Sequence, residues 1–96
     1  MLFRSAKMAR VTFGPALQRH VRSPPLDVAG DTVRAALDAA FAINERIRGY
    51  ILDDQSHLRK HMSIFVDGRM IADRQGFSEP VTPTSQIYIV QALSGG

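Results

Sequence analysis

Cysteine is absent from the 96-residue sequence, and no long apolar run interrupts it. Without cysteine the fold cannot depend on disulfides, and cysteine nucleophiles, thiolate metal sites and thiol redox chemistry are excluded. No apolar run is long enough to span a bilayer and no internal repeat is visible, so we expect neither a membrane protein nor a repeat array. If this protein handles sulfur, a group other than a thiol side chain must carry it.

Clusters of charge of one sign are also missing. Twelve basic residues, only two of them lysines, stand against nine acidic residues, which gives a net charge of +3, and the basic residues are scattered along the chain. A nucleic-acid-binding protein more often has a concentrated basic stripe with exposed aromatic residues between the charges. We therefore expect a solvated surface or an acidic protein partner, and no nucleic acid.

Two short motifs that resemble metal sites lack the ligands to complete them. Asp53 and Asp54 are adjacent carboxylates without a third ligand at a suitable spacing, which favours a solvated loop. His57 and His61 are four residues apart, but no glutamate follows His57, and the segment resembles the entry to a strand rather than a helix. We therefore expect no metal site.

Length and composition predict one small domain between two flexible ends. The apolar content of 45% is sufficient for a single core. Residues 1–7 are basic and lack the apolar middle of a signal peptide, so we expect a flexible leader and a cytoplasmic protein, with Met8 as an alternative native start. Residues 8–92 form the predicted domain, and residues 93–96 form a flexible tail.

The first half of the domain predicts two extended segments and a long helix. Residues 8–13 alternate between apolar and polar side chains, as a half-buried strand does. Residues 17–28 predict a second extended segment, which the prolines at 24 and 25 restrict to a sheet edge or a bulge. Asp31 or Thr32 can cap a helix over residues 32–46, which residues 46–48 would prolong as far as a cap at Gly49.

The second half predicts a hairpin, an irregular crossing and a closing strand. Residues 62–66 form a strand, Asp67-Gly68 favours a tight two-residue turn, and residues 69–72 form the return strand. Residues 76–85 are turn formers that tuck Phe77 and Val81 under the sheet, and residues 86–92 form the last strand. This order predicts an α+β fold of the β-grasp (ubiquitin-like) type: a mixed sheet of four to five strands with one main helix packed across one face.

The sequence ends in Leu93-Ser94-Gly95-Gly96, directly after the last predicted strand. Glycine has no Cβ, so two in succession leave the last peptide units unhindered and able to enter a narrow channel. If an enzyme attached AMP to the Gly96 carboxylate, a nucleophile could reach the carbonyl carbon without meeting a side chain. The alternative is that this glycine-rich end is simply frayed, as many termini are.

Several short sequence motifs are unspecific one by one, but their order and spacing together resemble a known family. They are the helix opening at Gly30-Asp31-Thr32-Val33, Leu37, the hairpin Ile64-Phe65-Val66-Asp67-Gly68, Val81 before a turn, the strand at residues 87–90, and the tail. In this order and spacing the sequence resembles the MoaD/ThiS family of ubiquitin-like sulfur carriers, over nearly all of residues 8–96. The long connection over residues 49–60 is similar to the larger members of that family.

Two departures from the family pattern are visible. Pro83-Thr84-Ser85 stands where the family commonly has Asp-Gly-Asp, which changes a turn. Gln91-Ala92 stands where the family often has prolines that stiffen the chain ahead of the tail. The second departure leaves open which partner enzyme binds the tail.

The resemblance implies a carrier cycle in which the chain is a substrate and not an enzyme. A MoeB/ThiF-like adenylating enzyme would use ATP to adenylate Gly96, a sulfur donor would replace AMP to leave a thiocarboxylate, and a sulfur-accepting synthase would take the sulfur. The chain itself would bind no cofactor. The destination of the sulfur, in molybdopterin, thiamine, cysteine or a specialised metabolite, stays open.

Partner docking is expected on the exposed face of the sheet near the tail. Because side chains alternate along a strand, the candidates are Phe65 and Ile89, or their neighbours Ile64 and Tyr88. We select Phe65, Tyr88 and Ile89 as the predicted partner-binding residues. The oligomeric state is left open.

Two other functions fit the same sequence. The first is a covalent protein modifier, in which Gly96 forms an isopeptide bond with a lysine of another protein. The second is a noncovalent interaction module, in which the Gly-Gly end has no chemistry.

Overall fold

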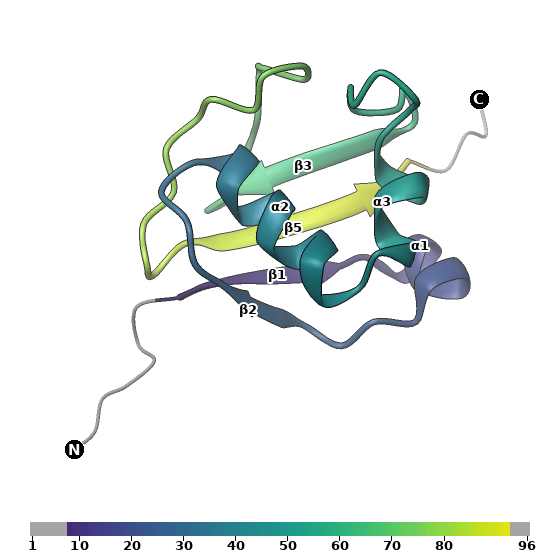
Figure 1. The fold of residues 1–96 in the computed structure, drawn as a ribbon, viewed down its shortest axis with the longest axis horizontal. Coiled ribbons are helices and arrows are strands. Elements are labelled where there is room, and N and C mark those ends of the chain that lie inside the picture. The colour runs from purple at the N-terminus through teal and green to yellow at the C-terminus, as the bar shows by residue number, and fades with distance from the viewer. Residues whose placement is uncertain (1–7, 93–96) are drawn as a thin grey trace.

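The computed structural model describes residues 8–92, which form five strands and three helices (Figure 1). The expected leader, residues 1–7, and the expected tail, residues 93–96, lie outside the described residues. In chain order the elements are β1 (Ala9–Phe13), α1 (Pro15–Val21), β2 (Leu26–Val28), α2 (Val33–Ile43), α3 (Arg46–Ile51), β3 (Met62–Val66), β4 (Arg69–Met70) and β5 (Gln86–Gln91).

The strands form one mixed sheet in the order β2-β1-β5-β3-β4. The first and last strands, β1 and β5, run parallel at its centre, with Val11 opposite Ile87 and Phe13 opposite Ile89. The other neighbouring strands are antiparallel. The predicted α+β class, with a mixed sheet and a parallel central pair, is therefore confirmed.

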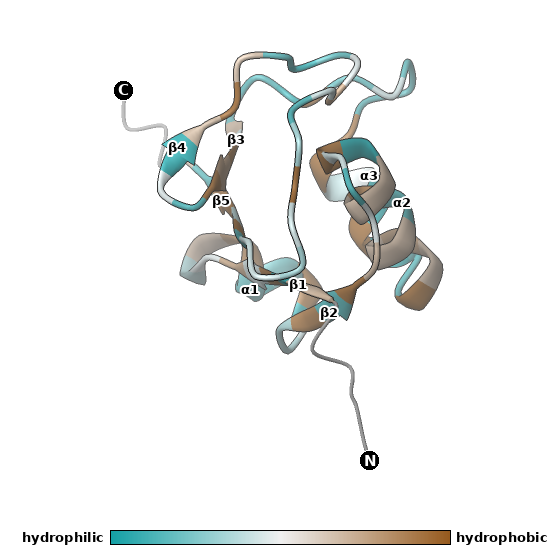
Figure 2. Ribbon diagram, turned by 90° about the vertical axis from the view of Figure 1, so that its left-hand side faces the viewer, coloured by the Kyte–Doolittle hydropathy of each residue, from teal (hydrophilic) through white to brown (hydrophobic). Residues whose placement is uncertain are grey.

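Helices α2 and α3 lie on the same side of the sheet (Figure 2). The hydroxyl of Thr32 accepts a hydrogen bond from the amide of Ala35 at 3.1 Å, which caps the start of α2. Such a cap contributes about 1 kcal/mol to stability. The buried residues of α2 recur at three- and four-residue intervals and face the sheet; they are Val33, Ala36, Leu37, Ala40 and Phe41.

The main helix ends earlier than predicted. Helix α2 stops at Ile43 and a separate helix, α3, follows, so the prediction of one helix over residues 32–46 with a cap at Gly49 is wrong in its second part. Asn44 has an extended backbone, and its side-chain oxygen accepts a hydrogen bond from the amide of Arg46 at 3.2 Å. This local bond gives the backbone an alternative to another helical turn.

The prediction of one extended segment over residues 17–28 is also wrong in part. Residues Pro15–Val21 form helix α1, and only Leu26–Val28 form strand β2. Pro15 stands at the start of α1, where its fixed backbone angle suits a helix. Leu17 of α1 is fully buried, so packing also favours the helix. Strand β2 does lie at an edge of the sheet, as the prolines predicted.

The predicted hairpin turn and irregular crossing are both present. Asp67 and Gly68 have φ of 52° and 85°, the positive angles that the tight turn between β3 and β4 requires. Phe77 and Val81, within the crossing, are buried in the core. Among residues 8–92, no helix is both long enough and apolar enough to cross a bilayer.

Candidate functional site

Strand pairing holds the chain as far as Ala92, where the predicted tail begins. Gln91 pairs with Met62 of β3, and the amide of Ala92 donates a hydrogen bond to the carbonyl oxygen of His61 at 2.7 Å. The predicted reactive residue Gly96 and its neighbours Leu93, Ser94 and Gly95 lie outside the described residues. The structure thus defines the base of the tail, at one end of the central strand.

One face of the sheet presents a row of side chains across four strands. Thr12, Tyr88, Phe65 and Met70 are aligned by the pairing of β1 with β5, of β5 with β3, and of β3 with β4. Tyr88 is 40% exposed and Met70 is 58% exposed, while Phe65 is half-buried. We call these three residues, together with the half-buried Val90, the outer patch. Its side of the sheet is opposite that of the buried Ile64 and Ile89.

The register corrects the predicted docking pair. Ile89 stands opposite Ile64 in the antiparallel pairing of β3 with β5, and both side chains are fully buried. The selection of Ile89 as a docking residue is therefore wrong, and the alternative candidate Ile64 is also excluded, because both belong to the core under the helices. Phe65 stands opposite Tyr88 instead, and these two share the outer patch. Their role in partner binding stays a prediction.

Met70 and Val90 are the members of the outer patch that sequence reasoning missed. A two-residue turn at Asp67-Gly68 pairs Val66 with Arg69 and Phe65 with Met70, so the hairpin pattern could have identified Met70. Val90 follows Tyr88 by two residues and therefore shares its face.

Polar side chains occupy the other end of the same face. Arg10 of β1 donates a hydrogen bond and ion pair to Asp27 of β2 at 3.1 Å, and both side chains are about half exposed. Arg10 also stands opposite Gln86 in the pairing of β1 with β5. The face is therefore apolar around Tyr88, Phe65 and Met70 and polar around Arg10, Asp27 and Gln86.

A hollow lies beside the end of β5. It has a volume of about 300 Å³ and is lined by Gly14, Pro15, Ala16, Arg19, Val90 and Gln91. A Cβ on Gly14 would lie 2.9 Å from Cγ1 of Val90 and 3.3 Å from the hydroxyl oxygen of Tyr88, so only glycine fits without displacing them. Gly14 thus allows Tyr88 and Val90 to lie close against β1 at the base of the tail.

The ionisable groups with shifted pKa values belong to turns. Hydrogen bonds from the amides of His57 and Gln55 lower the pKa of Asp53, and its loop is a surface loop, as predicted. Hydrogen bonds from Ser78 and from the amide of Gly76 hold the pKa of Asp73 well below its usual range. In residues 8–92 no three histidine, aspartate or glutamate side chains come together as metal ligands. His57 and His61 instead lie in the loop that precedes β3.

Comparison with solved structures identifies proteins of the same fold. SAMP1, small archaeal modifier protein 1, from Haloferax volcanii is 23% identical, and the match covers 93% of this chain and 99% of SAMP1 with a TM-score of 0.76. A chain of the BexX/CysO complex from Amycolatopsis orientalis is 18% identical over 92% of this chain and 99% of that chain, with a TM-score of 0.76. CysO from Mycobacterium tuberculosis is 19% identical over 88% of this chain and 99% of its own, with a TM-score of 0.74.

The sequence itself matches no protein-family model and no curated protein. At identities this low the structural likeness establishes the fold. Residues 8–92 form a β-grasp, ubiquitin-like fold, which confirms the architecture that the resemblance to MoaD/ThiS proteins implied.

Proposed function

We propose that this β-grasp chain is a sulfur carrier, whose Gly96 carboxylate is adenylated and then converted to a thiocarboxylate. The thiocarboxylate donates its sulfur in the biosynthesis of a cofactor, of cysteine or of a thio-metabolite. The observation that carries the proposal is the Gly95-Gly96 end of the sequence, which follows the central strand of the sheet by only a few residues.

The chemistry needs an unhindered acyl carbon on a firmly held support. The Gly96 carboxylate attacks the α-phosphorus of ATP, forming an acyl-adenylate and releasing pyrophosphate. A persulfide sulfur then attacks the acyl carbon and releases AMP, and a second thiol cleaves the resulting acyl disulfide to leave the thiocarboxylate. Both thiol-containing reactants belong to partners, because this sequence has no cysteine.

The partners of this cycle are a MoeB/ThiF-like adenylating enzyme and a sulfur-accepting synthase. The enzyme holds the ATP, so the chain is a substrate that needs no bound cofactor of its own, and we place the cycle in the cytoplasm. Docking uses the outer patch, where Tyr88, Phe65 and Met70 expose apolar surface that a partner can cover. The patch includes the strand that leads to the tail, so a protein seated on it lies beside the tail's base.

A covalent protein modifier is the second candidate. The observation in its favour is the likeness to SAMP1, a protein named as a modifier, over 93% of this chain. In that case a lysine amine of a target protein attacks the activated Gly96 carbonyl, forming an isopeptide bond and releasing AMP. The third function, a noncovalent module, needs no reaction at Gly96.

The test is incubation of the chain with an adenylating enzyme, ATP and sulfide, followed by intact-mass spectrometry. We expect a mass increase equal to the replacement of one oxygen atom by sulfur. Addition of one alanine after Gly96 should abolish this increase, whereas one alanine added before Met1 should leave it unchanged. Lysine conjugates that disappear on deletion of Gly96 would favour the modifier instead. A chain that shows neither product would contradict both reactions and leave the noncovalent module.

A further inference from the structure

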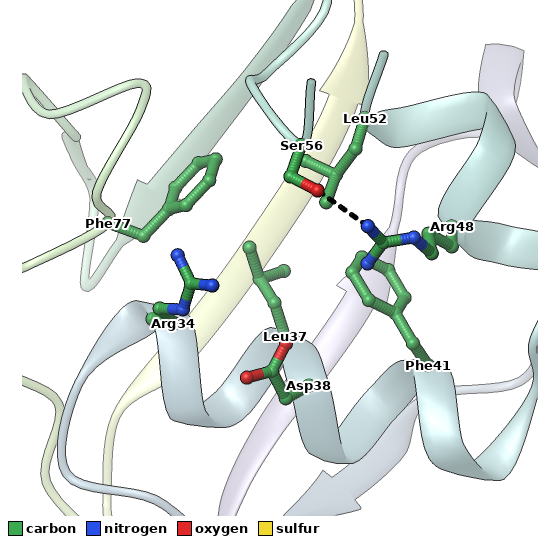
Figure 3. A pocket seen from close by; sticks show the side chains of 8 residues that line it. All are labelled: Arg34, Leu37, Asp38, Phe41, Arg48, Leu52, Ser56 and Phe77. Atoms are coloured by element: carbon green, nitrogen blue, oxygen red, sulfur yellow. Dashed lines mark hydrogen bonds between the residues drawn. The ribbon is translucent and has the colours of Figure 1, made fainter. Parts of the chain in front are cut away.

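A second recessed site lies on the helix side of the molecule. It is a pocket of about 50 Å³ between helices α2 and α3 and the loops that face them (Figure 3). Arg34 and Asp38 of α2 line it, together with Arg48 of α3 and Ser56 of the loop that follows. It lies on the other side of the sheet from the outer patch, so it is separate from the surface assigned to the adenylating enzyme.

Arg48 is held in place by two contacts. Its Nη2 donates a hydrogen bond to Oγ of Ser56 at 2.6 Å, and its guanidinium carbon lies 5.9 Å from the centre of the Phe41 ring (Figure 3). Guanidinium groups bind aromatic faces in this way. Because a fixed arginine loses less entropy on binding, its remaining N–H donors are already arranged for an acceptor.

Ser56 is itself fixed by a turn. Its amide donates a hydrogen bond to the carbonyl oxygen of Asp53 at 3.0 Å, and the Asp53 carboxylate accepts hydrogen bonds from the amides of Gln55 and His57. The hydroxyl that Arg48 binds therefore belongs to a loop that is itself held by hydrogen bonds.

Arg34 supplies a second positive charge to the same pocket. In Figure 3 its guanidinium points toward the space between Leu37 and Phe77. Within residues 8–92 neither Arg34 nor Arg48 forms an ion pair with a carboxylate; Arg10 and Asp27 form one elsewhere. Asp38 lines the pocket but bonds to neither arginine there, so the three charged groups leave a net charge of +1.

The floor of the pocket is apolar. Leu37, Phe41, Leu52 and Phe77 line it, and each is at most 6% exposed. Phe77 takes a left-handed backbone conformation with φ of 55°, and its carbonyl oxygen accepts a hydrogen bond from the amide of Arg34 at 3.0 Å. The apolar floor shields one side of a charged hydrogen bond from water, while Arg34 and Arg48, both exposed residues, leave its other side open to solvent.

We infer that this pocket binds a carboxylate group between Arg34 and Arg48. Arginine pairs with carboxylates through two parallel N–H donors, and two arginine side chains line this pocket. The volume of about 50 Å³ exceeds the roughly 10–15 Å³ that a cavity needs to hold one water. It accommodates a carboxylate head while the rest of the ligand stays outside. Asp38 makes a singly charged ligand preferable to a multiply charged one.

A carboxylate can come from a free small acid or from an acidic side chain of a protein, and one titration distinguishes the two sources. Sodium acetate is added to the ¹⁵N-labelled chain at constant ionic strength, with sodium chloride as the reference, while amide shifts are followed by NMR. We expect saturable shifts at the amides of Arg34, Ser56 and Phe77. The same titration is then made with an acetylated, amidated Gly-Glu-Gly peptide and with its Gly-Gln-Gly counterpart.

Saturation by the glutamate peptide and not by the glutamine peptide identifies an acidic side chain as the ligand. Saturation by acetate alone identifies a free small acid. Either result supports the carboxylate site.

Charge-removing variants supply the decisive control. Arg34→Gln and Arg48→Gln should each weaken acetate binding about tenfold, the loss expected when one charged hydrogen bond is removed. Arg46→Gln, an exposed change in the same helix α3 outside the pocket, should leave binding unchanged. Dispersed spectra of all variants would show that the fold is kept. Shifts that rise linearly with acetate, or an Arg34→Gln/Arg48→Gln chain that binds as tightly as the parent, would overturn the inference.

Discussion

At the scale of single residues, two glycines have the same free space around them but different backbone conformations. Gly49 lies inside helix α3 and Gly68 lies in the hairpin turn, and a Cβ added at either would meet nothing within 4 Å. Gly68 has φ of 85°, whereas Gly49 has no positive φ. The pair therefore separates backbone conformation from steric crowding.

Alanine substitution should have opposite effects at these two positions. Gly49→Ala should raise the free energy of unfolding by about 0.5–1 kcal/mol, because alanine favours the helix and restricts the unfolded chain. Gly68→Ala should lower it by about 1–2 kcal/mol, because a Cβ is disfavoured in the left-handed region. Urea unfolding of both variants measures the difference, and equal effects of the same sign would contradict this account.

The sequence predicted local structure correctly at positions where one or two residues determine the backbone conformation. Asp67-Gly68 identified the hairpin turn, and Asp31 or Thr32 identified the helix start, because such residues act on their immediate neighbours; Thr32 proves to be the cap. Asn44 was not identified as the end of α2. The Asn44 side chain accepts a hydrogen bond from the Arg46 amide, and this bond competes with continuation of the helix. The sequence alone does not show which of the two wins, because packing decides between them.

At the scale of elements, helix α1 shows how tertiary packing overrides a local pattern. The Pro24-Pro25 pair made residues 17–28 look like one interrupted strand, and the edge position of β2 was predicted correctly. The four-residue spacing of Leu17 and Val21 was a helical signal within this segment. Leu17 is fully buried and Val21 packs against the core, so burial favours a helix that ends at Val21, with Arg22 as its C-cap.

The crossing between β4 and β5 is organised by two carboxylates. Glu79 accepts hydrogen bonds from the amides of Ala72 and Asp73 through one oxygen. Asp73 accepts from the hydroxyl and amide of Ser78 and from the amide of Gly76, at 2.7, 3.1 and 2.8 Å. These side-chain hydrogen bonds hold the crossing in place of the backbone hydrogen bonds that pair strands.

The crossing should make stability depend on pH through Asp73. Its pKa is lowered in the folded chain, first by the Ser78 hydroxyl and then by the Gly76 amide, so the charged form contributes stability above the unfolded pKa near 3.8. That contribution is lost as the pH falls below this value. The difference in unfolding free energy between the parent and Asp73→Asn should therefore be largest at neutral pH and shrink on acidification.

Ser78→Ala provides the matched comparison, because it removes the largest cause of the lowered pKa and keeps the carboxylate. Asp73→Asn should then show a smaller pH-dependent difference in the Ser78→Ala background. Thermal unfolding followed from pH 7 down to strongly acidic solution measures both. A difference that stays constant with pH would rule out this role of Asp73.

At the scale of the whole molecule, the sheet separates a core face from the face that carries the outer patch. The alternation of side chains predicted two faces for each strand but not how the faces of β3 and β5 coincide. That relation depends on register, which the pairing of residues from distant parts of the chain sets. The topology was predictable from the order of elements, whereas the finding that Phe65 shares a face with Tyr88 and not with Ile89 required the structure. The chemistry at Gly96 stays a prediction.

Neighbouring substitutions in β5 should separate stability from partner binding. Tyr88→Ala, on the outer patch, should change the free energy of unfolding by less than about 1 kcal/mol and slow thiocarboxylate formation by the adenylating enzyme. Ile89→Ala, in the core, should cost about 2–5 kcal/mol. Ile89→Val, which costs about 0.5–1.5 kcal/mol, keeps the fold and should leave the reaction rate unchanged. A Tyr88→Ala chain that reacts at the parent rate would remove Tyr88 from the docking surface.

The position of β5 has a consequence for how this protein is made. Within residues 8–92, strands β1 and β3 are not neighbours in the sheet and each pairs with β5, which is the last of the five strands in the chain, so β5 joins the two halves of the sheet. In an unfinished nascent chain without β5, strands β1 and β3 have no strand between them to pair with. Pairing of strands that are far apart in the sequence also slows folding. Maturation of the sheet therefore waits until translation has passed residue 91, and a product truncated before β5 lacks the strand that unites it.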